Sequence, residues 1–377
     1  MEIYVVKKGD TVDSIAERFG IPVSSVIFDN QLVYPYPLAI GQALLLSVGE
    51  PFASDWPAYV NGYAYPYIRQ NVLEETLLYL TALSVFSYGF TTQGDLIPPA
   101  ADDSAVINSA LAAGVSPVLT LTPLGPDGNF NNSLITSLVN NEDAKSNLLS
   151  QLLAALQEKG FQGLDIDFEY ILPEDRVPFA DFVSEARAFL SPYGYHVSVA
   201  LAPKTSDTQA GLLYAGKDYR LLGEAADSVL LMTYEWGYIY GPPMAVAPIN
   251  KVREVVEYAV TRISPEKIDL GIPNYGYDWT LPFVRGRSRA RTISNLEAVQ
   301  LAIDADVPIS FDETAMSPYF RYERDGEIHE VWFEDVRSYR EKFSLLPKYS
   351  LRGMGYWQIM QFFRPNWLLL QDMFLIQ

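Results

Sequence analysis

Residues 161–170 are the most informative stretch of this chain; they read Phe161-Gln162-Gly163-Leu164-Asp165-Ile166-Asp167-Phe168-Glu169-Tyr170. Apolar residues alternate here with three acids, Asp165, Asp167 and Glu169, and a period of two residues predicts a β-strand. On a strand, these acids point to one face and the apolar side chains to the other. We expect a barrel strand, with the acids facing the barrel axis and the apolar residues facing helices. The alternative is an edge strand whose acids face water.

Eight apolar, β-branched runs of similar length follow one another along the chain; they are residues 59–65, 83–88, 117–122, 163–169, 197–202, 228–234, 268–275 and 353–359. Helical patterns lie between several of them, at residues 148–159, 177–190 and 252–263. Strands that alternate with helices eight times predict an α/β fold, a (β/α)8 or TIM barrel. A doubly wound open sheet is the alternative, but it usually has a Gly-rich turn after its first strand, and Tyr-Ala-Tyr-Pro-Tyr at 63–67 is no such turn.

A hairpin is predicted after the seventh run. Residues 319–322 and 328–333 alternate on either side of Asp325-Gly326, and this dipeptide is typical of a two-residue hairpin turn. We expect the hairpin to lie near the mouth of the barrel.

The composition narrows the chemistry. The 377 residues carry a net charge of −19 and contain no cysteine and two histidines, His196 and His329. Thiol nucleophiles and Cys-ligated zinc are excluded, two histidines are too few for a His-rich metal centre, and we expect neither a metal nor another cofactor. The acidic surplus disfavours nucleic acid and anionic membrane surfaces as partners. Catalysis is therefore left to carboxylates, hydroxyls or lysines. No pattern in the sequence fixes an oligomeric state.

The chain start does not resemble a targeting segment. The apolar run at residues 3–6 is too short for a signal-peptide core, and the basic residues Lys7 and Lys8 follow it instead of preceding it. No stretch approaches the length of a membrane span. We expect a protein without signal peptide or membrane insertion that is made in the cytoplasm.

Residues 1–48 differ from the rest. A strand-like run at 3–6, helical patterns ending at Gly20 and Asp29, and a last strand after Gly41-Gln42 form a β-α-α-β pattern. With Gly9-Asp10-Thr11, this pattern resembles the LysM module, which implies binding to the N-acetylglucosamine backbone of peptidoglycan or chitin. The alternative is a small packing cap on the same scaffold. Three basic and five acidic residues give this unit a net charge of −2, which leaves −17 for the rest. A turn-rich joint at 47–56 leads to the barrel domain, residues 49–377.

The three acids suggest a proton-transfer site. Same-face positions on a strand lie about 7 Å apart, so like charges in a partly dry barrel raise one another's pKa. We expect Asp165 and Asp167 to share a proton and Glu169, at the C-terminal rim, to stay protonated near neutral pH as a general acid.

If the reaction is glycoside cleavage, two acids on one side of one strand cannot straddle the bond as an ordinary acid–nucleophile pair does. The nucleophile must then come from elsewhere, such as the acetamido oxygen of the substrate. This would require an N-acetyl sugar.

Four motifs in chain order resemble glycoside hydrolase family 18. Residues 163–169 resemble its DGxDxDxE signature, although the acid that usually precedes the glycine is lacking. Leu-Met-Thr-Tyr-Glu at 231–235, Gly-Ile-Pro-Asn-Tyr-Gly-Tyr at 271–277 and Gly-Tyr-Trp at 355–357 resemble elements of its sixth, seventh and eighth strands. With the LysM-like start, the whole resembles the spore germination and cortex-lytic subgroup of Bacillus-type bacteria, whose members act as N-acetylglucosaminidases on spore peptidoglycan.

The resemblance assigns roles to residues of this sequence. Glu169 would be the acid, Asp167 would orient the acetamido group with Asp165 as its proton-sharing neighbour, and Tyr234 would hydrogen-bond the acetamido carbonyl. Trp357 would form the floor beneath the sugar. For Tyr234 and Trp357, packing in the core is the alternative. Further expected substrate contacts are Tyr63, Glu235, Trp236, Asn274 and Trp279; the two tryptophans and Tyr277 could equally be core.

Two departures from the family pattern stand out. Glu235 occupies a position where chitinases usually have Asp or Asn. The stretch between Trp279 and Phe311 is too short for the full α+β insertion of many chitinases, which predicts a more open groove. Lys204, after the fifth strand, is expected to be a solvated loop residue; contact with substrate carboxylates is the alternative.

The leading hypothesis is therefore a LysM-anchored enzyme that cleaves β-1,4 bonds next to N-acetylglucosamine in spore-cortex peptidoglycan and is assembled onto the spore coat or cortex. One alternative is a chitinase acting on N-acetylglucosamine polymers. The other is a non-catalytic glycan-binding coat protein, against which the intact Glu169 argues.

Overall fold

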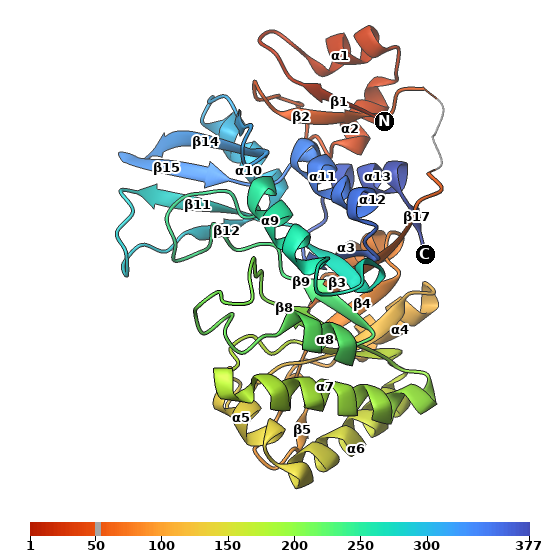
Figure 1. Cartoon of the computed structure of the whole chain (residues 1–377). Helices are drawn as coiled ribbons and strands as arrows, with labels where there is room; N and C mark the ends of the chain where they lie inside the picture. The colour runs from red at the N-terminus through yellow and green to blue at the C-terminus, as the bar shows by residue number, and fades with distance from the viewer. Residues whose placement is uncertain (50–53) are drawn as a thin grey trace.

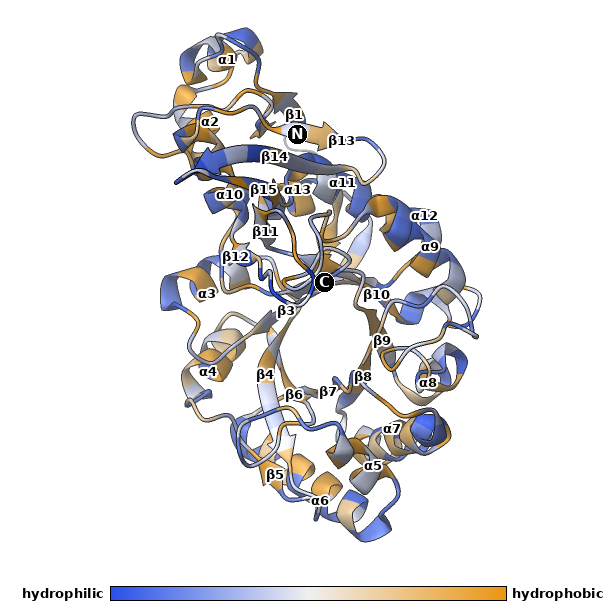
Figure 2. Cartoon of the chain, turned by 90° about the vertical axis from the view of Figure 1, so that its left-hand side faces the viewer, coloured by the Kyte–Doolittle hydropathy of each residue, from blue (hydrophilic) through white to orange (hydrophobic). Residues whose placement is uncertain are grey.

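Eight parallel strands form a closed ring in the computed structural model, which describes residues 1–49 and 54–377 (Figure 1). They are β3 (Pro57–Ala64), β4 (Ala82–Phe90), β6 (Ser116–Leu121), β7 (Gly163–Ile166), β8 (His196–Leu201), β9 (Ser228–Leu231), β10 (Ile268–Pro273) and β16 (Gly353–Trp357). The ring closes because β3 pairs with both β16 and β4. The predicted TIM barrel is confirmed, and Figure 2 looks into the ring. Residues 50–53 of the predicted joint lie outside the described residues.

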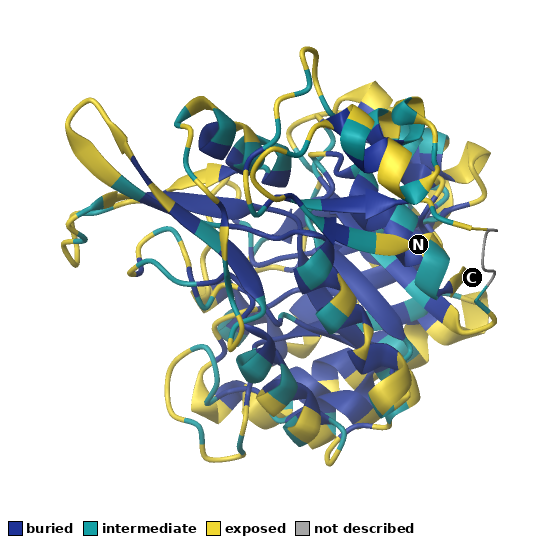
Figure 3. Ribbon diagram, turned by 90° about the horizontal axis from the view of Figure 1, so that it is seen from above, coloured by how far each residue is buried: buried dark blue, intermediate teal, exposed yellow. Residues whose placement is uncertain are grey.

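Helices surround the ring (Figure 2). They are α3 (Gln70–Leu77), α4 (Ser104–Ala112), α5 (Ser133–Val139), α6 (Glu142–Lys159), α7 (Arg176–Leu190), α8 (Tyr219–Ala225), α9 (Ile249–Ala259), α11 (Val336–Phe343), α12 (Leu345–Tyr349) and α13 (Arg364–Met373). The three helices predicted from periodicity correspond to α6, α7 and α9. Figure 3 shows buried strands inside the molecule and exposed residues on the surrounding helices and loops. Within residues 1–49 and 54–377, no helix has the length and apolarity needed to cross a membrane.

The apolar face of the acid-bearing segment is packed as predicted. Phe168 is fully buried, and its ring stacks on Phe179 and Phe182 of α7 at centroid distances of 5.6 and 6.2 Å. Burial of an aromatic ring of this size is worth about 2–3 kcal/mol. The alternating acids are thereby held toward the barrel axis by the packing on their other side.

An α+β insertion separates β10 from α11, so the prediction that this region is too short for one is wrong. It comprises β11 (Gly276–Leu281), β12 (Arg291–Ile293), α10 (Asn295–Asp304), β13 (Ser310–Asp312), β14 (Ser317–Arg324) and β15 (Glu327–Trp332). The strands form one antiparallel sheet in the order β12-β11-β15-β14-β13. The error arose because the predicted hairpin, which is β14–β15, was counted as a separate element. Its two-residue turn is confirmed, with Asp325 and Gly326 at φ 55° and 80°.

Residues 1–49 form the predicted β-α-α-β unit. Strands β1 (Glu2–Val5) and β2 (Ala43–Leu46) pair antiparallel, and α1 (Val12–Phe19) and α2 (Val23–Asp29) lie between them in sequence. Thr11 caps α1 in a capping box with Ser14, and Gly20 ends it in the left-handed conformation at φ 64°.

This small unit is docked on the rest of the protein through shared cores. Leu45 of β2 is fully buried within the barrel core, and Ala39 is buried in the core of the insertion. The Ile309 N–H donates to the Ile40 carbonyl over 2.8 Å, which joins the two backbones. The N-terminal unit therefore cannot reorient freely relative to the barrel.

Two arginines complete the docking. Arg337 of α11 donates to the Gly41 carbonyl over 3.2 Å. Arg364, at the start of α13, donates to the Phe28 carbonyl over 3.1 Å and pairs with Glu75 of α3 over 2.7 Å. One arginine thus joins the N-terminal unit to a barrel helix.

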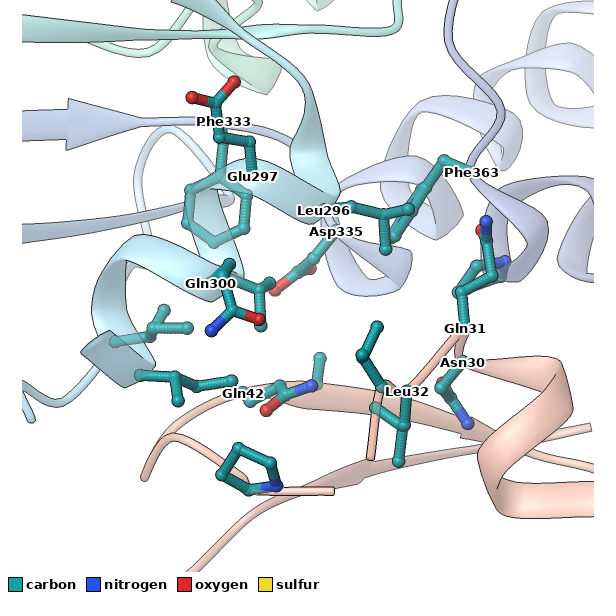
Figure 4. A pocket seen from close by; sticks show the side chains of 17 residues that line it. Asn30, Gln31, Leu32, Gln42, Leu296, Glu297, Gln300, Phe333, Asp335 and Phe363 are labelled. Atoms are coloured by element: carbon teal, nitrogen blue, oxygen red, sulfur yellow. The ribbon is translucent and has the colours of Figure 1, made fainter. Parts of the chain in front are cut away.

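A cavity of about 310 Å³ lies at this junction (Figure 4). Gln31, Leu32 and Gln42 of the N-terminal unit line one side, and Gln300 of α10 and Phe363 line the other. The docking contacts surround a partly open space, so the two surfaces are not packed flat against each other.

Gly41 offers a test of the docking. A Cβ atom there would lie 1.9 Å from the Ile309 carbonyl oxygen, whereas one at Gly20 would meet nothing within 4 Å, and both glycines have positive φ. G20A should lose about 1–2 kcal/mol of unfolding free energy from backbone strain alone. G41A should lose clearly more and should make residues 1–48 sensitive to limited proteolysis, because Ile309 must move. Equal losses in urea unfolding would contradict the docking.

Candidate active site

A cavity of about 530 Å³ opens at the C-terminal ends of the barrel strands. Its lining residues lie in β4 and β16 or in the segments that follow β3, β6, β7, β8 and β9; they are Tyr65, Phe86, Phe130, Asp167, Glu169, Tyr170, Leu213, Met232, Tyr234, Glu235, Tyr238 and Trp357. Active sites of (β/α)8 barrels lie at this end. Residues of β12 to β15 are not among them, so the inner wall of the groove is made by the barrel itself.

Three acids form a ladder from the barrel interior to this cavity. Asp165 is 1% exposed, Asp167 is 8% exposed, and Glu169 is exposed at the rim. Strand β7 ends at Ile166, but the Asp167 N–H still donates to the Leu121 carbonyl over 2.9 Å. The alternation therefore continues past the end of the regular strand and carries Glu169 into the groove.

Asp165 is buried but has two hydrogen-bond donors. The Tyr63 hydroxyl donates to its Oδ2 over 2.8 Å, and the Ser198 hydroxyl donates to its Oδ1 over 2.6 Å. Burial raises the pKa of Asp165, while these two hydrogen bonds favour its charged form and oppose the rise. Tyr63, expected as a substrate contact, is itself 2% exposed and lies beneath the groove as a partner of Asp165.

Asp167 has no such support. Its Oδ1 is buried without a hydrogen-bond partner among the described residues. Burial, followed by the nearby charges of Glu169 and Asp165, raises the pKa of Asp167 well above its ordinary value. A protonated Asp167 could donate a hydrogen bond along the ladder, which agrees with the expected sharing of one proton; the sharing itself stays a prediction.

Tyr234 and Glu235 lie side by side in the lining of the cavity. Burial and the charges of Asp167 and Glu169 raise the pKa of the Tyr234 phenol well above 10, so it remains a hydrogen-bond donor. Glu235 has a left-handed backbone at φ 66°, and its Oε1 accepts from the hydroxyls of Tyr275 and Tyr277, the latter over 2.8 Å. A non-glycine residue in this region is strained and needs such anchoring.

Trp357 lies at the end of β16 with its indole in the groove. Phe86 packs edge-on against it with a centroid distance of 4.9 Å, and Tyr63 and Tyr65 follow at 5.9 and 6.3 Å. These contacts fix the orientation of the indole. A fixed aromatic face in a cleft suits the apolar CH side of a sugar ring.

Residues 124–361, more than half of the chain, match the family model described as glycosyl hydrolases family 18. The chain belongs to glycosyl hydrolase family 18. It is therefore a glycoside hydrolase, and residues 4–47 match the model of the LysM domain.

Two spore-cortex relatives match this family 18 chain over nearly its whole length, and a chitinase matches most of it. The Cortical fragment-lytic enzyme of Bacillus subtilis (strain 168) is 38% identical over 426 aligned positions that cover 99% of this chain and 98% of the relative. The crystal structure of the spore cortex-lytic enzyme SleL of Bacillus megaterium QM B1551 superposes with a TM-score of 0.92 at 33% identity and covers 100% and 98% of the two chains. A chitinase of Chromobacterium violaceum ATCC 12472 has a TM-score of 0.77 at 25% identity and covers 84% and 98%.

Besides Tyr63, three residues expected to contact substrate in this family 18 enzyme lie away from the groove lining. Trp279 is 1% exposed in the insertion and donates its indole N–H to the Gly241 carbonyl over 2.8 Å. Asn274 is buried and donates to the Gln358 and Gln361 carbonyls, which holds the segment after β16. Trp236 packs against the barrel core.

Two lysines of the family 18 barrel are buried, which the sequence did not predict for Lys204 and gave no sign of for Lys217. Lys204 is 3% exposed, so its expected solvation is wrong, and its Nζ donates to the Lys217 carbonyl over 2.7 Å. Lys217 is 1% exposed, and its Nζ donates to the Ala200 carbonyl over 3.2 Å. Two loop lysines in an acidic protein carry no local pattern that indicates burial.

The Tyr63 hydroxyl gives a prediction for the ladder. Y63F removes a donor to the charged form of Asp165, so the pKa of Asp165 rises further and the acid limb of the pH–rate profile should move to higher pH. Loss of a hydrogen bond to a charged group costs about 1.5–3 kcal/mol; we expect kcat to fall about 10- to 100-fold. Y322F is the matched control, because Tyr322 donates to the buried Asp278 over 2.8 Å in the insertion. Equal effects of both variants on the profile would contradict the assignment.

Proposed function

We propose that this enzyme hydrolyses β-1,4 bonds next to N-acetylglucosamine in spore-cortex peptidoglycan, by a retaining mechanism in which the substrate supplies the nucleophile. Residues 1–48 form the glycan-anchoring module and residues 49–377 the catalytic domain. The supporting relatives have names that refer to cortical fragments and to the spore cortex, and they match the chain from end to end, including the N-terminal unit.

One observation carries the mechanism: the carboxylates of the groove lining are Asp167 and Glu169 from one strand end and Glu235, whose Oε1 is held by two phenols. Asp167 and Glu169 come from one strand end and cannot straddle a bond between them, and burial raises the pKa of Glu235, which disfavours the charged form that a nucleophile needs. The acetamido oxygen of an N-acetyl sugar is the nucleophile that this arrangement leaves. Tyr234, a neutral hydrogen-bond donor in the lining, would orient this oxygen.

We assign the residue roles from the resemblance to family 18, and the exposure and charge of the residues are compatible with them. Glu169, at the rim, protonates the glycosidic oxygen and then activates water. Asp167 accepts the acetamido N–H and stabilises the positive oxazolinium ion, while Asp165 takes part of the shared proton. Trp357 is the floor under the reacting sugar, and Glu235 is held ready as a further sugar contact.

Substrate binding must overcome electrostatic repulsion, because peptidoglycan is anionic and the chain carries a net charge of −19. Affinity then comes from aromatic contacts, and exposed rings flank the groove at Phe130, Tyr170 and Tyr238. Electrostatic steering would not help this substrate.

A Glu169→Gln variant tests the reaction. It should lose hydrolysis of cortex fragments by at least a thousandfold, since it cannot donate the proton, while its binding of the same fragments stays within about threefold. The wild type should not cleave a matched oligosaccharide whose 2-acetamido groups are replaced by hydroxyls, because that substrate has no internal nucleophile.

Hydrolysis by E169Q, or rapid cleavage of the 2-hydroxyl substrate, would overturn the mechanism. Mass spectrometry of the products separates the substrates: chitin oligomers cleaved faster than cortex fragments of equal length would instead favour a chitinase, the activity named for the structural neighbour from Chromobacterium violaceum.

The anchor needs a test that leaves the docking intact, since deletion of residues 1–48 would uncover Leu45 and its neighbours in the barrel core. The double variant E169Q/W357A disables the groove in the full chain. It should still sediment with insoluble cortex peptidoglycan, because the LysM module is untouched, and wild-type protein should fractionate with the spore cortex. A double variant that stays in the supernatant would remove the anchoring role.

A further inference from the structure

Lys217 is a buried ammonium group beside the acid ladder. It lies between β8 and α8, is 1% exposed, and makes one described hydrogen bond, to the Ala200 carbonyl. A lysine ammonium carries three donors and is strongly hydrated in water. A buried lysine with a single neutral acceptor is costly unless a negative charge compensates it.

The strand register identifies the compensating charge. Strands β7 and β8 pair as far as Ile166 opposite Val199, and Asp167 and Ala200 are the next residue of each segment. The ammonium bound to the Ala200 carbonyl lies near enough to Asp167 for the charge of each group to shift the pKa of the other, and the Oδ1 of Asp167 has no hydrogen-bond partner among the described residues. A buried cation with a single neutral hydrogen-bond acceptor and a carboxyl group with one unpartnered oxygen thus belong to neighbouring segments of the barrel wall.

The position of Lys217 is built by other buried groups. Lys204 Nζ donates to the Lys217 carbonyl over 2.7 Å, and the Tyr219 hydroxyl accepts from the Lys204 N–H and donates to the Ala202 carbonyl. These are also the titratable groups on the β8 and α8 side, whereas Asp167 and Glu169 face Lys217 from the β7 side. The contacts fix the backbone that carries the ammonium.

We propose that Lys217 is a positioning residue that acts through Asp167: its ammonium is the buried counter-ion that lets Asp167 and Glu169 carry one negative charge between them during catalysis. The proposal rests on the function proposed above for these two acids. The segment between β8 and α8 would then contribute to the reaction through Lys217, although Lys217 does not line the groove.

The charge of this lysine changes within an accessible pH range. Burial lowers the pKa of Lys217 to about 8, although the charges of Asp167 and Glu169 oppose the fall. In turn, Lys217 lowers the pKa of Asp167, against the larger effect of burial. The ammonium is present below about pH 8 and lost above it. Its contribution to catalysis should follow the same course.

The test is a comparison of wild type with K217M and K267M over pH 5–9. Lys267 is a matched control, because its Nζ donates to the Gly223 and Ala226 carbonyls over 2.8 Å each, outside the groove lining. At pH 6 we expect K217M to lose at least tenfold in kcat with little change in KM. The ratio of the wild-type kcat to the K217M kcat should fall toward one above pH 8. The ratio of the wild-type kcat to the K267M kcat should not depend on pH.

A K217M ratio that is independent of pH would reduce Lys217 to a structural residue and overturn the proposal. K217R keeps a charge at all pH values tested and should extend activity above pH 8 relative to wild type; failure of a folded K217R to do so would also count against the proposal, even if K217M does not fold. If E169Q is inactive but the Lys217 variants have the same pH dependence of kcat as the wild type, only the role of Lys217 is rejected. If E169Q is active, the proposed catalytic function itself is rejected.

Discussion

The burial of a carboxylate in the barrel axis is the constraint on which this site depends. Asp165 is 1% exposed, and removing a carboxylate from water costs several kcal/mol unless hydrogen bonds replace the lost hydration. Tyr63 and Ser198 replace part of it and thereby fix both oxygens of Asp165. The next acid, Asp167, has no comparable donors, so the two neighbouring acids differ in proton affinity because their surroundings differ.

The same period of two that aims the acids inward also makes the ladder rigid. Phe168 is wedged between the acids in sequence and stacks on two phenylalanines of α7. A rotation that moved Glu169 would have to withdraw Phe168 from a close-packed core, where displaced contacts are not regained. Site geometry and core packing are therefore set by one short segment.

The sequence predicted the features that are encoded within a few consecutive residues. The eight runs gave the barrel, and Asp325-Gly326 gave the hairpin, because strand alternation and turn conformation are encoded within a few residues. The extent of the insertion could not be found in this way, since β11 pairs with β15 across about fifty residues of intervening chain. The environment of Trp279 depends on that pairing. Because residues 276–281 belong to the sheet of the insertion, Trp279 is buried there and does not face the sugar groove.

The burial of charged side chains is a second feature that local sequence patterns do not predict. It affects both the barrel and the N-terminal unit. Lys204 and Lys217 look like solvated lysines in sequence, yet each binds a backbone carbonyl in the interior, because the β8–α8 segment folds back over a strand end.

Arg364 and Arg337 similarly look like surface arginines but hold the LysM unit against α13 and α11. Leu45 and Ala39 are shared with the barrel and insertion cores, and exposing a buried leucine alone costs about 1.5–3 kcal/mol. A module held in this way keeps one orientation relative to the groove, so a glycan bound to it would approach the acid ladder from a fixed direction.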